Sequence, residues 1–202
     1  MSTRMIVSPA VFVVSIGLIA TVGTGVASAK KKPPISFSGS TTCTVNGKIA
    51  YQPALTTTGT GSSTVILSGS LSHCNNAKQG GVSLKGGHLQ GLKGSVTPDD
   101  CSTLASGPEP ALSGGTVKWT PTSKIIPSGG VSFPVGVGSL VMSGGGNDSL
   151  QISYAAGSVA SGSFPNTGSS SLTVTSNDDT TQLTTACANG ISSIAFKGTV
   201  TL

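Results

Sequence analysis

The chain has 202 residues, of which 36% are hydrophobic and only 8% are charged, and its formal net charge is +5. The hydrophobic share is large enough for a folded core, so the low charge does not indicate disorder. The length predicts one domain once an N-terminal export segment is set aside.

The first 29 residues predict a secretory signal peptide. Arg4 gives a positive start, an apolar run follows from Ile6 to about Ile19, and Ala27-Ser28-Ala29 has the small-x-small pattern of a cleavage site. An uncleaved transmembrane anchor is the alternative, since Lys30 to Lys32 follow a run of nearly spanning length. We expect cleavage after Ala29 and no transmembrane span afterwards. The expected segments are a signal peptide over residues 1–29, a basic Pro-containing leader over 30–34 and a single domain over 35–202.

Cleavage would change the charge balance and place the domain outside the cytoplasm. It removes Arg4 and leaves ten Lys and six acidic residues, and three of those Lys fall in the leader. The folded body would then be close to neutral. We therefore expect a secreted or envelope-associated domain with no basic face of the kind that binds nucleic acid.

Four cysteines follow the export segment, at Cys43, Cys74, Cys101 and Cys187. An even number of cysteines in an exported chain predicts two disulfides. Three pairings are open. We favour Cys43–Cys74, which would join neighbouring early strands, together with Cys101–Cys187. Free thiols or a metal site are the alternatives, but the chain has no Cys-x-x-Cys.

Apolar residues alternate with Ser and Thr along most of the chain, as in half-buried β-strands. No window shows the 3.6-residue stripe of a helix. Ten or more short strands predict an all-β, antiparallel β-sandwich of immunoglobulin-like or jelly-roll type, with a closed β-barrel as the alternative. The clearest runs are Val65–Leu71, Val117–Trp119, Val131–Val137, Leu150–Ala156 and Ile194–Leu202.

Glycine pairs divide these runs. Asn46-Gly47 and Asn189-Gly190 have the composition of two-residue hairpin turns. Gly114-Gly115 predicts a further break, whereas Gly86-Gly87 predicts a bulge or bend within a strand. The longest segment without a strand pattern runs from about Pro98 to Ser113.

The sequence contains no serine-hydrolase, nucleotide-loop or zinc-protease motif. A glycosidase needs two carboxylates across one cleft, but all the carboxylates here lie in turn-like segments. We therefore expect solvated loop side chains and no catalytic residues. The six carboxylates are Glu109, Asp99, Asp100, Asp148, Asp178 and Asp179.

The acidic pairs suggest one metal hypothesis. Asp99-Asp100 adjoins Cys101, and Asp178-Asp179 lies eight residues before Cys187. If these cysteines are bridged and a hairpin folds the chain back, both pairs lie at one end of the domain, where loop oxygens suit Ca²⁺. The calcium candidates are Asp99, Asp100, Asp178 and Asp179, and no other cofactor is expected.

Histidines and aromatic residues indicate no further site. His88 would be partly buried if its strand continues unbroken through Gly86-Gly87, and His73 is expected in an exposed turn. The aromatic residues alternate in phase with apolar neighbours, which favours the core over an exposed platform for sugars. The residues concerned are Tyr51, Trp119 and Tyr154.

The stretches Ser113 to Thr122 and Phe196 to Leu202, with the four cysteines, resemble a group of uncharacterised, small, secreted β-rich proteins of actinobacteria. The resemblance covers most of the mature chain and implies export in a high-GC Gram-positive organism. It implies no activity, ligand or site residue.

Three functions stay open. The favoured one is a non-enzymatic binding or structural domain whose partner is a cell-wall polymer or another extracellular protein. The second is a secreted hydrolase that uses loop Asp residues, which requires two Asp in one cleft. The third is an oligomeric envelope pore or adhesin, which requires a large apolar patch or an unpaired hairpin near Val131 to Met142.

Overall fold

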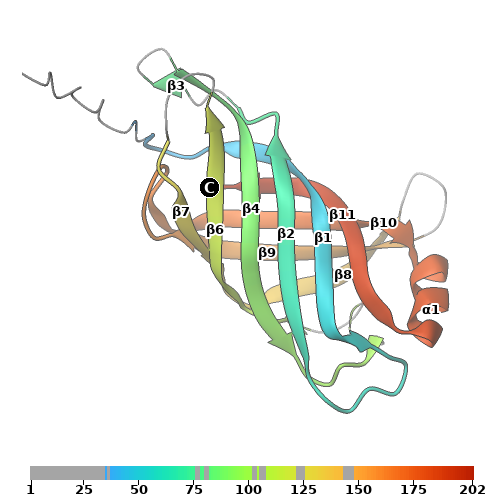
Figure 1. Cartoon of the computed structure of the whole chain (residues 1–202). Helices are drawn as coiled ribbons and strands as arrows, with labels where there is room; N and C mark the ends of the chain where they lie inside the picture. The colour runs from blue at the N-terminus through green and yellow to red at the C-terminus, as the bar shows by residue number, and fades with distance from the viewer. Residues whose placement is uncertain are drawn as a thin grey trace, which may run out of the picture. The chain divides into compact units, whose positions relative to one another are not determined.

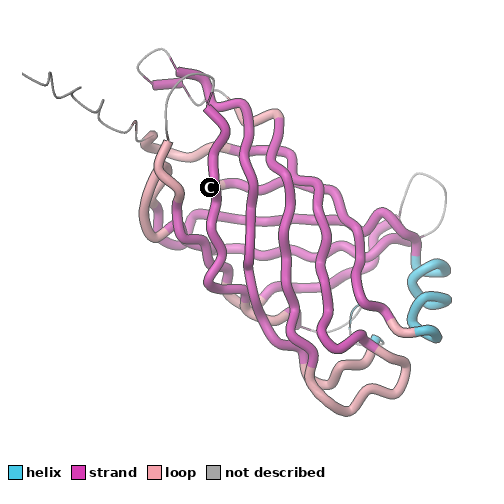
Figure 2. Tube along the Cα trace, in the orientation of Figure 1, coloured by secondary structure: helices cyan, strands magenta, loops and turns pink. Residues whose placement is uncertain are grey.

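Antiparallel strands account for most of the residues that the structure describes (Figures 1 and 2). The structure is a computed structural model, and it describes residues 35, 37–75, 78–79, 82–101, 104, 108–121, 126–142 and 148–202. The predicted signal peptide and leader lie outside these residues. In chain order the elements are β1 (Thr42–Leu55), β2 (Ser63–Ser72), β3 (Lys78–Gln79), β4 (Val82–Val96), β5 (Pro108–Glu109), β6 (Leu112–Pro121), β7 (Gly129–Phe133), β8 (Gly136–Met142), β9 (Asp148–Val159), β10 (Asn166–Asp179), α1 (Thr180–Asn189) and β11 (Ile191–Thr201).

Eight strands close into an antiparallel β-barrel. The pairing order is β1, β2, β4, β6, β7, β9, β10 and β11, and β11 pairs back with β1. The short strands extend this frame: β8 continues β7 in the same register against β9, and β5 continues β6 against β8. The all-β prediction is confirmed. The predicted sandwich is wrong, because the first and last strands pair and leave no sheet edge between them.

Asn46-Gly47 lies in the middle of β1, so the predicted hairpin turn at this pair is wrong. Gly47 pairs with Phe196 of β11 and with Gly69 of β2. A Cβ atom at Gly47 would lie 2.9 Å from the Phe196 ring and nearer still to the backbone of Ser68. The glycine therefore allows three strands to approach closely. Interpreting it as a turn divides a 14-residue strand into short pieces, which is what favoured a short-stranded sandwich.

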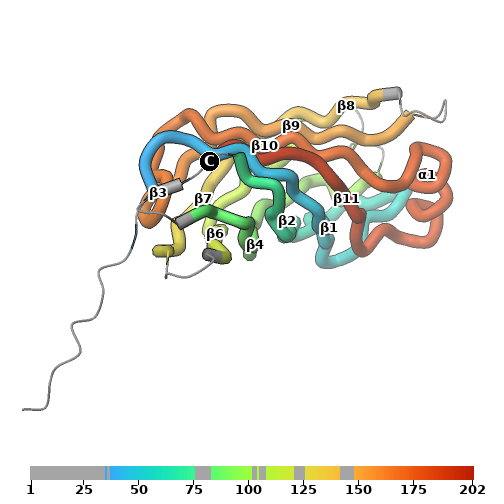
Figure 3. Tube along the Cα trace, turned by 90° about the horizontal axis from the view of Figure 1, so that it is seen from above, coloured from blue at the N-terminus to red at the C-terminus, as the bar shows by residue number. Residues whose placement is uncertain are grey.

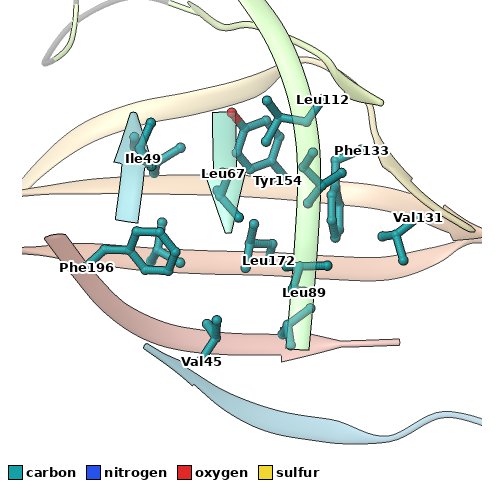
Figure 4. Close-up of a cluster of buried hydrophobic side chains, with 14 of the residues drawn as sticks. Val45, Ile49, Leu67, Leu89, Leu112, Val131, Phe133, Tyr154, Leu172 and Phe196 are labelled. Carbon is teal, nitrogen blue, oxygen red and sulfur yellow. The ribbon is translucent and has the colours of Figure 1, made fainter. Parts of the chain in front are cut away.

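Side chains from around the barrel fill its interior (Figure 4). Viewed from above, β8, β9 and β10 lie on one side of this interior and β2, β4 and β6 on the other (Figure 3). Tyr51, Trp119 and Tyr154 are all buried, as predicted. A sandwich and a barrel bury the same alternate positions, so the alternation alone does not distinguish them.

The predicted irregularity at Gly86-Gly87 is confirmed. The pairing of β4 with β6 shifts register between Leu84 and Gly86. An extra residue reverses which side chains face the interior. Leu89 is consequently buried and His88 is exposed, so the expectation of a partly buried His88 is wrong.

Aromatic rings close one end of the barrel. Phe37, before β1, stacks on Phe164 of the β9–β10 connection with ring centroids 5.3 Å apart. Trp119 meets Phe164 edge-on at 5.4 Å. The Phe164 amide also donates to the Phe37 carbonyl at 3.0 Å. We call this the aromatic end.

Both favoured disulfides are present, Cys43–Cys74 and Cys101–Cys187. The first lies where β1 begins, and the second lies at the opposite end, where it fastens α1. Two disulfides suit an oxidising compartment outside the cytoplasm. The described part of the chain includes no helix long and apolar enough to cross a membrane.

Candidate functional site

A pocket of about 310 Å³ lies at the α1 end of the barrel. Its wall is mainly apolar and comes from residues far apart in the sequence. The apolar lining consists of Leu104, Leu140, Leu150, Leu183, Ile191 and the Cys101–Cys187 disulfide. We call this cavity the α1 pocket.

Helix α1 forms one wall of the pocket, and its position is fixed at both ends. At its start the Asp179 carboxylate accepts from the Gln182 amide at 2.9 Å, while the Gln182 side chain accepts from the Asp179 amide at 2.9 Å. This reciprocal capping box satisfies two backbone donors that a helix start leaves open. Near its end Cys187 is bonded to Cys101, and the helix stops at Gly190.

Helix α1 was not predicted from the sequence. Its residues are rich in Thr, which is a poor helix former, and Leu183 and Cys187 give only two apolar positions on one face. The hairpin turn predicted at Asn189-Gly190 is therefore wrong, because Asn189 ends α1 and Gly190 follows it. The metal hypothesis required a hairpin between Asp179 and Cys187, and α1 occupies that segment instead. The Asp-x-x-Gln spacing at Asp179 and Gln182 was the signal that would have revealed the helix.

Strands β8 and β9 form the facing wall. Leu140 pairs with Leu150 across these strands, and both side chains line the pocket. Leu150 is buried, whereas Leu140 is 46% exposed. The exposure of Leu140 thus marks a side of the pocket that opens to solvent.

Polar groups lie among the apolar lining at a few points. They belong to Thr57, Asp100, Thr180 and Thr184. Asp100 also forms a β-bridge with Thr56, and the Thr56 amide donates to the Asp99 carbonyl at 3.1 Å. These contacts fix the β1–β2 and β4–β5 connections to each other beside the pocket.

Glu109 is buried, so the expectation of a solvated loop carboxylate is wrong for this residue. It lies in β5 and is 7% exposed. Burial raises the pKa of its carboxyl from 4.5 to about 7. Burial also raises the pKa of Tyr51 and Tyr154, and the charge of Glu109 adds to both shifts.

Two glycines of β8 make room for this buried group. A Cβ atom at Gly138 would lie 2.8 Å from the Glu109 Oε1 atom, and one at Gly136 would lie 2.6 Å from the Tyr154 ring. Gly136, Gly138 and Leu140 occupy alternate positions on one face of the strand. This face of β8 therefore passes the Tyr154 ring first, then the Glu109 carboxyl, and then the α1 pocket.

The calcium candidates lie just after β4 and at the end of β10. The Asp99 carboxylate accepts from the Gly61 amide at 2.8 Å, and Asp179 caps α1. Asp100 lines the pocket, and the Asp178 carbonyl accepts from the Ser176 hydroxyl at 2.6 Å. Within the described ranges no three His, Cys, Asp or Glu side chains are placed to hold a metal ion.

Exposed hydrophobic residues are few in the part of the chain that the structure describes. The large ones are Val135, Val137 and Leu140. They fall in the predicted segment, Val131 to Met142, but β7 and β8 are both paired with β9 and Leu140 lines the pocket. Val135 and Val137 remain on the surface, and exposed residues of this kind are ordinary in soluble proteins.

Comparison of the chain with known protein-family models, with curated proteins and with solved structures finds no match.

Proposed function

We propose that the barrel is a binding protein for a small amphiphile with an apolar body and a neutral or cationic polar end. The observation that carries this proposal is the α1 pocket, which is apolar, open to solvent and bounded by a disulfide-fastened helix. Small-molecule sites are typically cavities of about 300–1,000 Å³ lined by apolar residues with a few polar groups.

The pocket volume limits the ligand's size. An apolar protein cavity of about 150 Å³ holds one benzene molecule. A pocket of about 310 Å³ therefore suits a body of about two fused or linked rings, or an alkyl chain of similar volume. The hydroxyls of Thr57, Thr180 and Thr184 would bind its polar end.

The surrounding charge favours a neutral or cationic ligand. Asp100 lies in the lining, and the other acidic residues of this end lie on the connections and strand ends around it. A carboxylate in a partly apolar site repels an anionic group more strongly than it would in water. These neighbours are Asp99, Asp148, Asp178 and Asp179.

The pocket supports binding better than hydrolysis. Hydrolysis by paired carboxylates needs two of them across one cleft. Asp100 is the one carboxylate among the described residues that line the pocket.

A matched pair of fluorescent probes tests the proposal. N-phenyl-1-naphthylamine is neutral, and 8-anilinonaphthalene-1-sulfonate has the same ring system with an added anionic group. We expect saturable, one-to-one binding of the neutral probe and at least about tenfold weaker binding of the anionic one. Tighter binding of the sulfonate would contradict the charge argument.

Adjacent threonines of α1 provide the variant and its control. Thr184 lines the pocket and donates to the Thr180 carbonyl at 2.7 Å, whereas Thr185 makes the same type of bond to Thr181 at 2.9 Å without lining the pocket. Thr184→Phe should fill the pocket and abolish binding of the neutral probe, while Thr185→Phe should leave it intact. Equal effects of the two variants would contradict a site in this pocket.

A further inference from the structure

The charged side chains are separated between two parts of the barrel. Strands β11, β1, β2, β4 and β6 lie side by side (Figure 1) and contain no Asp or Glu. The same strands carry five exposed lysines, whose outward face we call the lysine wall. They are Lys48, Lys85, Lys93, Lys118 and Lys197. The charge total of the folded body is near neutral because it averages this wall with an acidic α1 end, and the expectation that no basic face binds nucleic acid stays a prediction.

One row of cross-strand pairs shows how the wall is arranged. Its members, in order around the barrel, are Lys118, His88, Ser70, Asn46 and Lys197. Neighbouring strands are about 4.8 Å apart, so the two lysines are separated by about 19 Å. The positions between them carry imidazole, hydroxyl and amide groups. The row thus presents cations at intervals, with hydrogen-bonding groups between them.

An open groove of about 430 Å³ lies in this wall. Lys48, Asn46, His88 and Gln90 are among its lining residues, and Ser70 lies 3.5 Å from the Nδ1 atom of His88. These side chains donate to and accept from hydroxyl groups, and a lysine pairs strongly with a phosphate oxygen.

The wall lacks the groups that protein and single-stranded nucleic-acid partners use. Tyr51, Trp119 and Phe196 belong to its strands but are buried. No large hydrophobic side chain described on these strands is exposed, since Val135, Val137 and Leu140 lie in or next to β8. Protein interfaces depend on buried aromatic and apolar anchors, and single-stranded nucleic acids on aromatic stacking platforms. Charge and hydrogen bonding are what remain for recognition.

We infer that the lysine wall binds a linear polyol-phosphate chain, with lysines on the phosphates and the polar side chains of the groove on the polyol hydroxyls. This interaction is independent of the α1 pocket. A polyanion held on the wall is repelled by the acidic α1 end, so the pocket would stay open to its own ligand. The protein would thereby be retained on an anionic polymer while its pocket is free.

Binding of the purified, disulfide-intact protein to immobilised poly(glycerol phosphate) tests this inference. We expect binding at 50 mM salt that weakens steeply at 300 mM, because added salt screens exposed charges. Lys48→Gln combined with Lys197→Gln should weaken binding about tenfold. Val135→Glu combined with Val137→Glu is the matched control, since it lowers the net charge by the same two units on another part of the barrel. The control should change affinity by less than about twofold.

Three results would overturn the inference. The first is no binding of poly(glycerol phosphate) at 50 mM salt. The second is an equal loss in the wall variant and the control, which would make net charge the cause. The third is binding of single-stranded DNA with the same number of phosphates as tightly as the polyol phosphate. Probe binding in the α1 pocket should be unchanged in both variants, so failure here is distinct from failure of the proposed function.

Discussion

At the aromatic end of the barrel Phe37, Phe164 and Trp119 pack ring against ring, whereas at the other end a capped helix and a disulfide border a pocket of about 310 Å³. Both ends border the same apolar interior. The aromatic end is closed by direct core packing, which leaves no room for a ligand. The α1 end is bordered by a disulfide-bonded helix, which forms one wall of a pocket that opens to solvent. If this pocket binds a ligand, as we propose, stability and binding are separated along the barrel.

The largest expected effect comes from removing the Cys101–Cys187 disulfide, which fastens α1. Replacing Cys101 and Cys187 together by Ala opens a loop of 86 residues and should lower the free energy of unfolding by about 4.5 kcal/mol. Because α1 is then no longer fixed over the pocket, the neutral probe should also lose affinity. Urea unfolding and probe titration measure the two effects.

The other disulfide is the control for this experiment. Removing Cys43–Cys74, with a separation of 31 residues, should cost about 3.5 kcal/mol and leave probe affinity unchanged. If both variants lose probe binding, general destabilisation of the barrel causes the loss, and not the missing bond between Cys101 and Cys187.

A similar loss of stability should follow from Phe164→Ala at the aromatic end. Removing a fully buried ring that contacts Phe37 and Trp119 should cost about 3–5 kcal/mol. The probe's dissociation constant, measured where the variant remains folded, should not change. A weaker probe affinity would mean that the two ends are coupled.

A pH-dependent effect of intermediate size is expected from Glu109. Its carboxyl has a pKa near 7 in the folded protein against 4.5 in the unfolded chain, so between these values the folded state binds more protons. Stability should therefore be fully present below about pH 4.5 and fall by about 3 kcal/mol as the pH rises through 7. Urea unfolding at several pH values measures this slope. Glu109→Gln should flatten it, and an unchanged slope in that variant would contradict a buried, ionising Glu109.

The smallest expected effect concerns the helix cap. Asp179→Ala removes the acceptor for the Gln182 amide and should cost about 1 kcal/mol. Asp179→Asn keeps an oxygen acceptor and should retain most of this stability. Amide exchange at Gln182 should speed up in the Ala variant and much less in the Asn variant. If both variants behave alike, the carboxylate charge and not the hydrogen bond stabilises α1.

The local pattern predicted which side chains are buried but not how the strands close. Tyr51, Trp119 and Tyr154 are in the core because alternation reports the buried face of any sheet. Closure depends on β1 pairing with β11 across the whole chain length, and no local pattern records that contact. Gly47 led to one wrong prediction. The Asn46-Gly47 pair is typical of a hairpin turn, whereas here the glycine allows neighbouring strands to approach closely.

Most of the candidate site could not be predicted from the sequence, for a related reason. Glu109 stands between two prolines in a segment with no strand pattern, yet pairing with β8 turns it inward over Gly138. The lysine wall is invisible in a charge total, because lysines from four strands are brought together only by the barrel. The cysteine pairs were predictable, because an even count in an exported chain leaves few alternatives.

The central claim is that the barrel binds an apolar ligand at its α1 end and nowhere else. Methyl-detected NMR with increasing amounts of N-phenyl-1-naphthylamine tests it most directly. We expect shifts confined to methyl groups lining the pocket, including those of Leu104, Leu140, Leu150, Leu183 and Ile191, with none in Leu84 or in Ile126. Shifts absent from the pocket methyls, or centred on Val135 and Val137, would contradict it.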